Sequence, residues 1–252
     1  MKKRRSLLFG VAVGLALGWA GTASIAQDEA VPELSTKLDI AYVSKYVWRG
    51  IPQTSEGAVQ PSLTLSHSSG LSLNFWASED VDKGKFTEHD YTVNYAWDTQ
   101  GLAMNAGYIY YAFPNTSYQS TSEIYYSVCF GGLLSPTFSV NYDINEAKGF
   151  YAGLAVGYSY PVALSKMSTS LSLGAKLSYS NSRYNAFWFG KDESGLADLY
   201  LTASMPFSVG KASVTPSLSY YTIVDDALSD GLSSMGLKSN NFVGGLTASY
   251  AF

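Results

Sequence analysis

Residues 241–252 read Asn-Phe-Val-Gly-Gly-Leu-Thr-Ala-Ser-Tyr-Ala-Phe, and this stretch decides the fold class. Side chains alternate between the two faces of a strand, so Leu246, Tyr250 and Phe252 share one face while Thr247 and Ser249 share the other. A strand of about ten residues with one apolar and one polar face is typical of a transmembrane β-barrel, where it separates lipid from an aqueous lumen.

The same two-residue period recurs along the chain. Residues 171–179, Leu-Ser-Leu-Gly-Ala-Lys-Leu-Ser-Tyr, show it most clearly. The first such segment runs from Leu38 to about Trp48, with Tyr46 and Trp48 on the apolar, lipid-facing side. Taken together, the segments predict an all-β fold, namely an antiparallel up-and-down transmembrane β-barrel of about twelve strands.

The lengths of the connections support this prediction, because outer-membrane barrels alternate short periplasmic turns with longer external loops. Turns are expected at residues 68–70 and 98–101, although the connection at 161–167 is longer. The external loops are predicted at 50–58, 79–86, 113–121, 144–148, 181–194 and 222–240. A secreted β-sandwich also alternates, but its outward face should be polar, so the barrel is favoured.

The beginning of the chain has the three parts of a secretory signal peptide. Lys2–Arg5 are basic, residues 7–19 are apolar, and Ser24-Ile25-Ala26 is a cleavage site of small residues. We therefore expect residues 1–26 to be a signal peptide, residues 27–37 a periplasmic leader and residues 38–252 the barrel. The expected location is the outer membrane of a Gram-negative bacterium.

Composition agrees with this assignment. Aromatic residues make up 15% of the 252 residues, whereas charged residues make up only 14%, against the roughly 25% usual for soluble domains. Removal of the signal peptide leaves 12 basic against 20 acidic residues, a net charge of −8. This acidity argues against a nucleic-acid partner. We expect outer-membrane lipid and lipopolysaccharide to surround the barrel.

Charged side chains on the polar face are the candidate functional residues, because a charge there requires water or a partner. Six acidic and three basic residues would give the lumen a mild preference for cations. The alternative is that Lys45 and Arg49 pair with Glu88 and Asp90 across adjacent strands to stiffen the wall. The predicted pore-lining residues are Asp39, Lys45, Arg49, Glu88, Asp90, Glu123, Asp143, Lys176 and Asp198.

The sequence offers little to a catalytic interpretation. His67 lies at a turn, and His89 points to the lipid side while Glu88 and Asp90 point inward, so a metal or acid–base site is awkward to build. We expect no enzymatic activity, no metal and no cofactor. Cys129 is the only cysteine, which excludes an intramolecular disulfide, and its position in the alternation predicts that it faces the lumen.

Several segments resemble a known family. Residues 43–51 (Val-Ser-Lys-Tyr-Val-Trp-Arg-Gly-Ile), 59–61 (Val-Gln-Pro), 69–78 and 88–91 (Glu-His-Asp-Tyr) are similar to the TorF-type porin family of proteobacteria, over about the first third of the chain. The resemblance implies an outer-membrane pore with Arg49, Glu88 and Asp90 in a lumen cluster. Tyr250 and Phe252 likewise resemble the C-terminal signal that the barrel assembly machinery recognises.

Two functions follow as hypotheses. The first is a porin-like channel for passive diffusion of small polar or cationic solutes. The alternative is a closed barrel that acts as a structural or surface-binding protein through its external loops. A third, an outer-membrane lipid hydrolase, would need His67 or His89 beside a serine on the lipid face. The long loops at 181–194 and 222–240 are best placed to fold inward or to contact a ligand.

Overall fold

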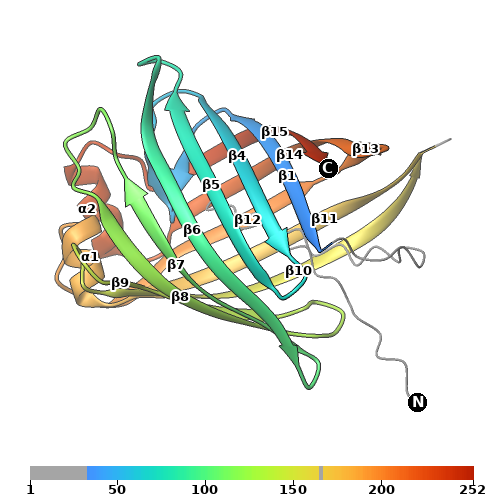
Figure 1. Cartoon of the computed structure of the whole chain (residues 1–252). Coiled ribbons are helices and arrows are strands. Elements are labelled where there is room, and N and C mark those ends of the chain that lie inside the picture. Colours follow the sequence, from blue (N-terminus) through green and yellow to red (C-terminus); the bar gives the residue numbers. More distant parts are fainter. Residues whose placement is uncertain (1–32, 165–166) are drawn as a thin grey trace.

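The computed structural model describes residues 33–164 and 167–252, so the expected signal peptide, residues 1–26, lies outside the described residues. Twelve long strands form one closed wall (Figure 1). They are β1 (Leu34–Val43), β4 (Ala58–His67), β5 (Leu71–Asp80), β6 (Lys85–Thr99), β7 (Leu102–Ala112), β8 (Thr121–Phe130), β9 (Thr137–Asp143), β10 (Phe150–Leu164), β11 (Met167–Ser180), β12 (Gly195–Ser204), β14 (Ala212–Ile223) and β15 (Asn240–Ala251).

Every strand of the wall is antiparallel to both neighbours, and neighbours in the sheet follow one another in sequence. The pairing of β12 with β14 and of β1 with β15 closes the cylinder. The short strand β13 (Phe207–Val209) extends the edge of β14. The predicted antiparallel up-and-down barrel of about twelve strands is therefore confirmed.

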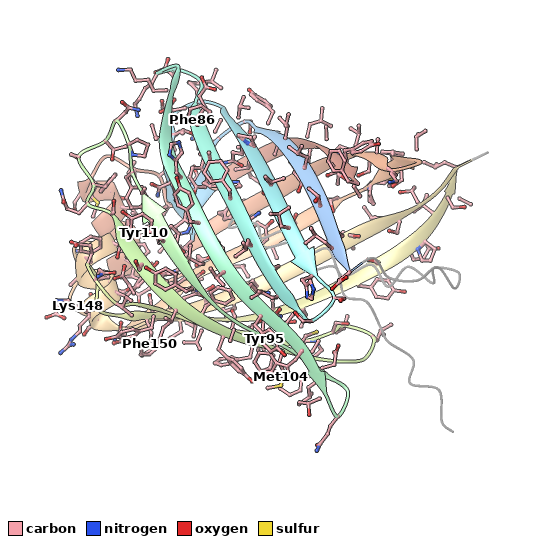
Figure 2. All side chains as sticks on the ribbon, viewed as in Figure 1. Phe86, Tyr95, Met104, Tyr110, Lys148 and Phe150 are labelled. Atoms are coloured by element: carbon pink, nitrogen blue, oxygen red, sulfur yellow. The ribbon has the colours of Figure 1, made fainter. Side chains whose placement is uncertain are left out.

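The outer surface of the wall is apolar. Ile40 is 55% exposed, Leu246 50% and Leu154 56%, and Figure 2 shows Tyr95, Met104 and Tyr110 directed away from the wall. A soluble protein rarely exposes so large an apolar surface, whereas a membrane barrel needs one. The alternation read from the sequence thus places these side chains on the lipid-facing side of the barrel.

The two ends of the barrel differ. Longer connections, residues 44–57, 113–120, 181–194 and 224–239, gather at one end, which we call the loop end. The other end, which we call the turn end, has tight turns such as residues 68–70 and 100–101.

The first loop folds into the barrel. Its strands β2 (Val47–Trp48) and β3 (Ile51–Pro52) form a small hairpin that pairs only with itself. We call residues 44–57 the plug hairpin. The prediction that the first strand continues to Trp48, with Tyr46 and Trp48 facing lipid, is wrong: the strand ends at Val43, and Tyr46 and Trp48 are only 2% and 6% exposed. Ser44, the residue after the strand, still bonds to Gly244 of β15: its amide donates to the Gly244 carbonyl and its hydroxyl accepts the Gly244 amide.

Two helices lie at the loop end (Figure 1). α1 (Ser182–Trp188) begins where the side chain of Asn181 accepts the amide of Tyr184, and α2 (Asp226–Ser234) begins where Asp225 accepts two amides. Their buried faces join the plug hairpin and the wall in a hydrophobic core inside the barrel. This core includes Tyr46, Trp48, Ile51, Trp76, Tyr151, Tyr184, Phe189, Ile223, Leu228 and Leu232.

Other boundaries also differ from expectation. β1 begins at Leu34, inside the segment expected to be a leader, and β10 continues through Pro161, where a long connection was expected. Neither α1 nor α2 is long and apolar enough to cross a membrane, and the described residues include no other helix.

Candidate functional site in the barrel lumen

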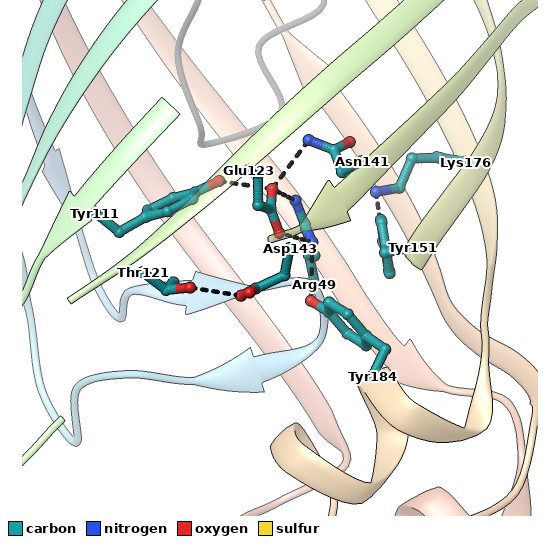
Figure 3. Close-up of polar contacts among 9 residues, drawn as sticks. All are labelled: Arg49, Tyr111, Thr121, Glu123, Asn141, Asp143, Tyr151, Lys176 and Tyr184. Atoms are coloured by element: carbon teal, nitrogen blue, oxygen red, sulfur yellow. Dashed lines mark hydrogen bonds and ion pairs between the residues drawn. The ribbon is translucent and has the colours of Figure 1, made fainter. Parts of the chain in front are cut away.

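Arg49 is the centre of the polar groups inside the barrel. It stands at the tip of the plug hairpin, where Arg49 (φ 49°) and Gly50 (φ 81°) both adopt left-handed backbone conformations that make the tight turn. Its guanidinium meets the carboxylate of Glu123 on β8 with two parallel contacts, Nη1 to Oε1 at 2.8 Å and Nη2 to Oε2 at 2.6 Å. Nη1 also donates to the hydroxyl of Tyr184 at 2.9 Å (Figure 3).

Aromatic rings enclose the same guanidinium. Its central carbon lies 4.5 Å from the ring of Trp48, 4.4 Å from that of Tyr151 and 5.6 Å from that of Tyr184. Burial disfavours the charge, but the interaction with Glu123 more than offsets this and keeps the pKa of Arg49 well above its usual value. Arg49 is therefore a permanently charged group that is surrounded by aromatic rings.

Glu123 is bound from three sides. Besides Arg49, its Oε2 accepts the hydroxyl of Tyr111 at 2.9 Å and the amide of Asn141 at 3.0 Å. Its side chain is 1% exposed. A carboxylate with this many donors at such depth is fixed in position, so the ion pair anchors the plug hairpin to the wall.

Glu88 and Asp90 on β6 form a second group, which consists of acidic residues alone. They lie beside Tyr46, whose pKa is raised by burial and then by these two carboxylates. Asp90 is 0% exposed, and its carboxyl group interacts directly with that of Glu88. This part of the lumen thus holds two interacting buried carboxyl groups that no cation contacts among the described residues.

Lys176 and Asp198 form a third group through Tyr151. The ammonium of Lys176 donates to the Tyr151 hydroxyl at 2.6 Å, and that hydroxyl donates to Oδ1 of Asp198. All three side chains are buried. The chain of contacts joins β10, β11 and β12 across the inside of the wall.

The remaining predicted residues lie apart from these groups. Asp143 accepts the hydroxyl of Thr121 at 2.8 Å and two backbone amides of the following loop, so it orders that loop. Asp39 contacts Lys37 and Ser249 near the seam between β1 and β15. Lys45 is half-buried at the base of the plug hairpin. Cys129 is half-buried near the turn end.

The predicted pairing of Lys45 and Arg49 with Glu88 and Asp90 is not what the structure contains. Arg49 pairs instead with Glu123, because the first strand ends early and the chain crosses the lumen. Periodicity along one strand gives no information about such a crossing. Periodicity also did not identify Tyr111, Tyr151 and Tyr184 as functional residues, although they supply hydroxyls and rings to the groups above. The apolar run Tyr46-Val47-Trp48, which breaks the alternation, was the available signal.

Toward the turn end the lumen is lined by small polar side chains. Asn74 donates to Ser62 at 2.9 Å and to Thr64 at 2.8 Å, and Asn105 donates to Ser127 at 3.4 Å. Ser62, Asn105 and Ser127 are half-buried, in contrast to the fully buried groups near the plug hairpin. The lumen is therefore polar at this end. Over the described residues, no group of three or more His, Cys, Asp or Glu side chains could hold a metal ion.

Comparison with known families gives one match. Residues 27–151 match the family model Gcw_chp. This model is described as a bacterial protein of unknown function, and the matched residues include the plug hairpin, Glu88, Asp90 and Glu123. No curated protein matches the chain.

Solved outer-membrane porins share the fold. The chain is similar to the KdgM porin, with a TM-score of 0.54 at 10% identity over 86% of this chain and 99% of that chain. KdgM porin in complex with disordered oligogalacturonate gives a TM-score of 0.51 at 9% identity over the same shares. The NanC porin gives 0.48 at 10% identity over 84% and 98%. At 9–10% identity, the likeness to the two KdgM structures shows the fold alone, that of an outer-membrane porin.

Proposed function

We propose that the protein is a narrow outer-membrane channel for small polar or cationic solutes, and that it is a TorF-type porin. The observation that carries this proposal is the placement of Arg49 by an inward-folded loop against Glu123 on the opposite part of the wall. A charged contact of this kind inside a polar lumen is how a pore limits the size and charge of what passes. A twelve-stranded barrel is intermediate between filled eight-stranded barrels and wide porins.

The charges of the lumen support a preference for cations. The six predicted carboxylates, Asp39, Glu88, Asp90, Glu123, Asp143 and Asp198, outnumber the cations Lys45, Arg49 and Lys176. Confinement in a low-dielectric wall concentrates the field of such an excess. The mechanism we propose is diffusion along the polar wall past the plug hairpin, without catalysis and without a cofactor.

The apolar outer surface of the barrel supports a location in the outer membrane. The apolar band would contact outer-membrane lipid and lipopolysaccharide, after export by the signal peptide and insertion by the barrel assembly machinery. Tyr250 and Phe252 remain the proposed assembly signal. Tyr250 is 44% and Phe252 60% exposed, which suits recognition from outside the wall. No nucleic-acid partner is proposed.

Single-channel recording tests this function. Refolded residues 27–252 in planar bilayers should give steady conductance steps, with a reversal potential that favours cations in a salt gradient. Arg49→Ala should change the conductance and increase the cation preference, because Glu123 then loses its counter-ion. Arg183→Ala, which removes an exposed arginine of α1, is the matched control. Identical selectivity in the Arg49 and Arg183 variants would contradict a constriction at Arg49.

A second function, a closed barrel that acts through its loops, is favoured by the hydrophobic core at the loop end. Tyr184, Leu228 and Leu232 are 0% exposed there, so the plug is well packed. A folded barrel that is silent in bilayers, and still silent when residues 46–53 are replaced by a short Gly-Ser linker, would support this second function.

A further inference from the structure

A pocket beside the plug hairpin borders the groups described above, since Glu88, Glu123 and Tyr111 are among its lining residues. Four aromatic rings, Trp48, Tyr111, Phe113 and Trp188, line it together with the side chain of Glu88. The residues come from the plug hairpin, β6, β7, α1 and the loop at residues 113–120, so the pocket is at the loop end of the barrel. The pocket has a volume of about 10 Å³, which is room for about one water-sized group.

The rings form a continuous wall. Trp48 contacts Trp188 edge to face at 4.7 Å between centroids and Tyr111 at 6.2 Å, and Tyr111 stacks with Phe113 at 6.4 Å. Electron-rich ring faces attract cations, and tryptophan does so most strongly. The ring of Trp48 already attracts one cation, since the guanidinium of Arg49 lies over it.

The charges around the pocket do not balance. Asp90 interacts with both Glu88 and Glu123, but Arg49 is the one cation in contact with any of these three carboxylates among the described residues. Both ion-pair contacts of Arg49 are with Glu123. Glu88, which faces the pocket, and the buried Asp90 behind it thus lack a counter-ion, a costly arrangement unless a cation or a proton joins them.

We propose that this pocket binds the ammonium group of a small primary amine, with Glu88 as its counter-ion and the rings as its walls. The carboxylate would accept hydrogen bonds from the ammonium, while the rings exclude water and stabilise the charge. Asp90 would act through the field it adds behind Glu88. This inference rests on the proposed channel, for which it names a solute class, but the site is defined independently of conduction.

Binding of ethylammonium chloride to the refolded barrel in detergent tests the proposal. Trp48 and Trp188 line the pocket, so intrinsic fluorescence and calorimetry should both report saturable binding. Ethanol, neutral and of similar size, should bind at least tenfold more weakly. Sodium chloride at equal ionic strength controls for screening.

The matched variants are Glu88→Gln and Glu146→Gln, the second of which removes an exposed carboxylate of a loop at the same end. Glu88→Gln should raise the Kd for ethylammonium about tenfold or more, because a charge-assisted hydrogen bond is lost, whereas Glu146→Gln should leave it unchanged. Retention of the heat-modifiable band on gels shows that each variant is folded. If Glu88→Gln lowers affinity but Trp188→Leu does not, the aromatic wall is contradicted.

The outcomes separate this inference from the channel. Conductance without saturable ethylammonium binding overturns the amine site alone, and indicates that Glu88 and Asp90 share a proton instead. Binding that depends on Glu88 in a barrel without conductance overturns the channel alone. Equal binding of ethylammonium and ethanol would also overturn the amine site, since the charge would then play no part.

Discussion

Lys176 and Asp198 contact the same atom, the hydroxyl oxygen of Tyr151. The first donates to it and the second accepts from it, so one phenol links a buried cation to a buried anion on neighbouring strands. Because the direct contacts of both charges pass through this oxygen, its removal leaves two buried ionised groups incompletely bonded.

Tyr151→Phe should therefore lower the free energy of unfolding by about 1–3 kcal/mol, the usual effect of leaving buried polar groups without partners. Urea titration in lipid vesicles, followed by loss of the heat-modifiable band, measures this change. Tyr158→Phe removes a hydroxyl from the lipid face and should change stability by a few tenths of a kcal/mol at most. Equal effects of the two variants would contradict the bridging role of Tyr151.

The turn at the tip of the plug hairpin depends on Gly50. Its φ is +81°, and a β-carbon there would stand 2.5 Å from Cδ1 of Ile223 and 3.1 Å from Cβ of Asp198. Gly50→Ala should displace the hairpin from the wall and increase the exposure of Trp48, seen as a red shift of tryptophan emission. Gly84→Ala isolates the backbone cost, since Gly84 also has a positive φ (+59°) but no atom within 4 Å of the added carbon. Its emission should stay unchanged.

The ion pair of Arg49 and Glu123 should control the opening of the plug hairpin. Removal of one partner leaves a buried charge, at a cost of about 3–5 kcal/mol, whereas the double variant Arg49→Ala/Glu123→Ala should cost less than the sum of the single ones. Hydrogen exchange at the amides of Tyr46 and Gln53, which are bonded to Thr54 and Tyr46 within the hairpin, reports this opening.

The control is an exposed ion pair. Lys37→Ala breaks the contact with Asp39 near the surface, where such a pair contributes about 0–1 kcal/mol, and should leave the exchange of the hairpin amides unchanged. Strictly additive effects of Arg49→Ala and Glu123→Ala would show that the two residues act separately.

Alkaline pH should weaken the barrel through Tyr46. Burial and the carboxylates of Glu88 and Asp90 hold the pKa of Tyr46 well above its usual value, whereas in the unfolded chain a tyrosine ionises near pH 10. A raised folded pKa stabilises the fold fully below about pH 10, and the stabilisation is lost as the pH rises above that value. Urea titrations between pH 8 and 11.5 should show a steeper loss for the natural protein than for Tyr46→Phe, and equal losses in the two proteins would contradict this role of Tyr46.

The wall could be predicted from the sequence and the contents of the lumen could not. Alternation placed Ile40 and Leu246 on the lipid face because a strand in a barrel is bounded on one side by hydrocarbon and on the other by polar groups, a condition that every second residue must satisfy. Tyr46 and Trp48 continue the period of the first strand, and only the apolar Val47 between them departs from it, although both rings are buried inside the barrel.

The partner of Arg49 could not be predicted from the sequence for the same reason. Local pattern identified Glu123 as an inward carboxylate, but the two residues are 74 positions apart, and a contact over this separation depends on the path of the plug hairpin across the lumen. For Tyr184, by contrast, the sequence does contain a local signal for the helix that carries it. Asn181 ahead of it is a good residue to begin a helix, and that local signal marks α1 inside a segment predicted only as a loop.

The plug hairpin also constrains the order in which the molecule folds. It lies early in the chain, yet its tip rests on Glu123, Tyr184 and Ile223, which are supplied by the middle and late parts of the chain. Contacts over such separations form only after the intervening loops have closed. We expect the wall to assemble first, around a wet interior, and the plug hairpin to dock last, so that the nascent barrel passes through a hollow intermediate before its own first loop enters the lumen.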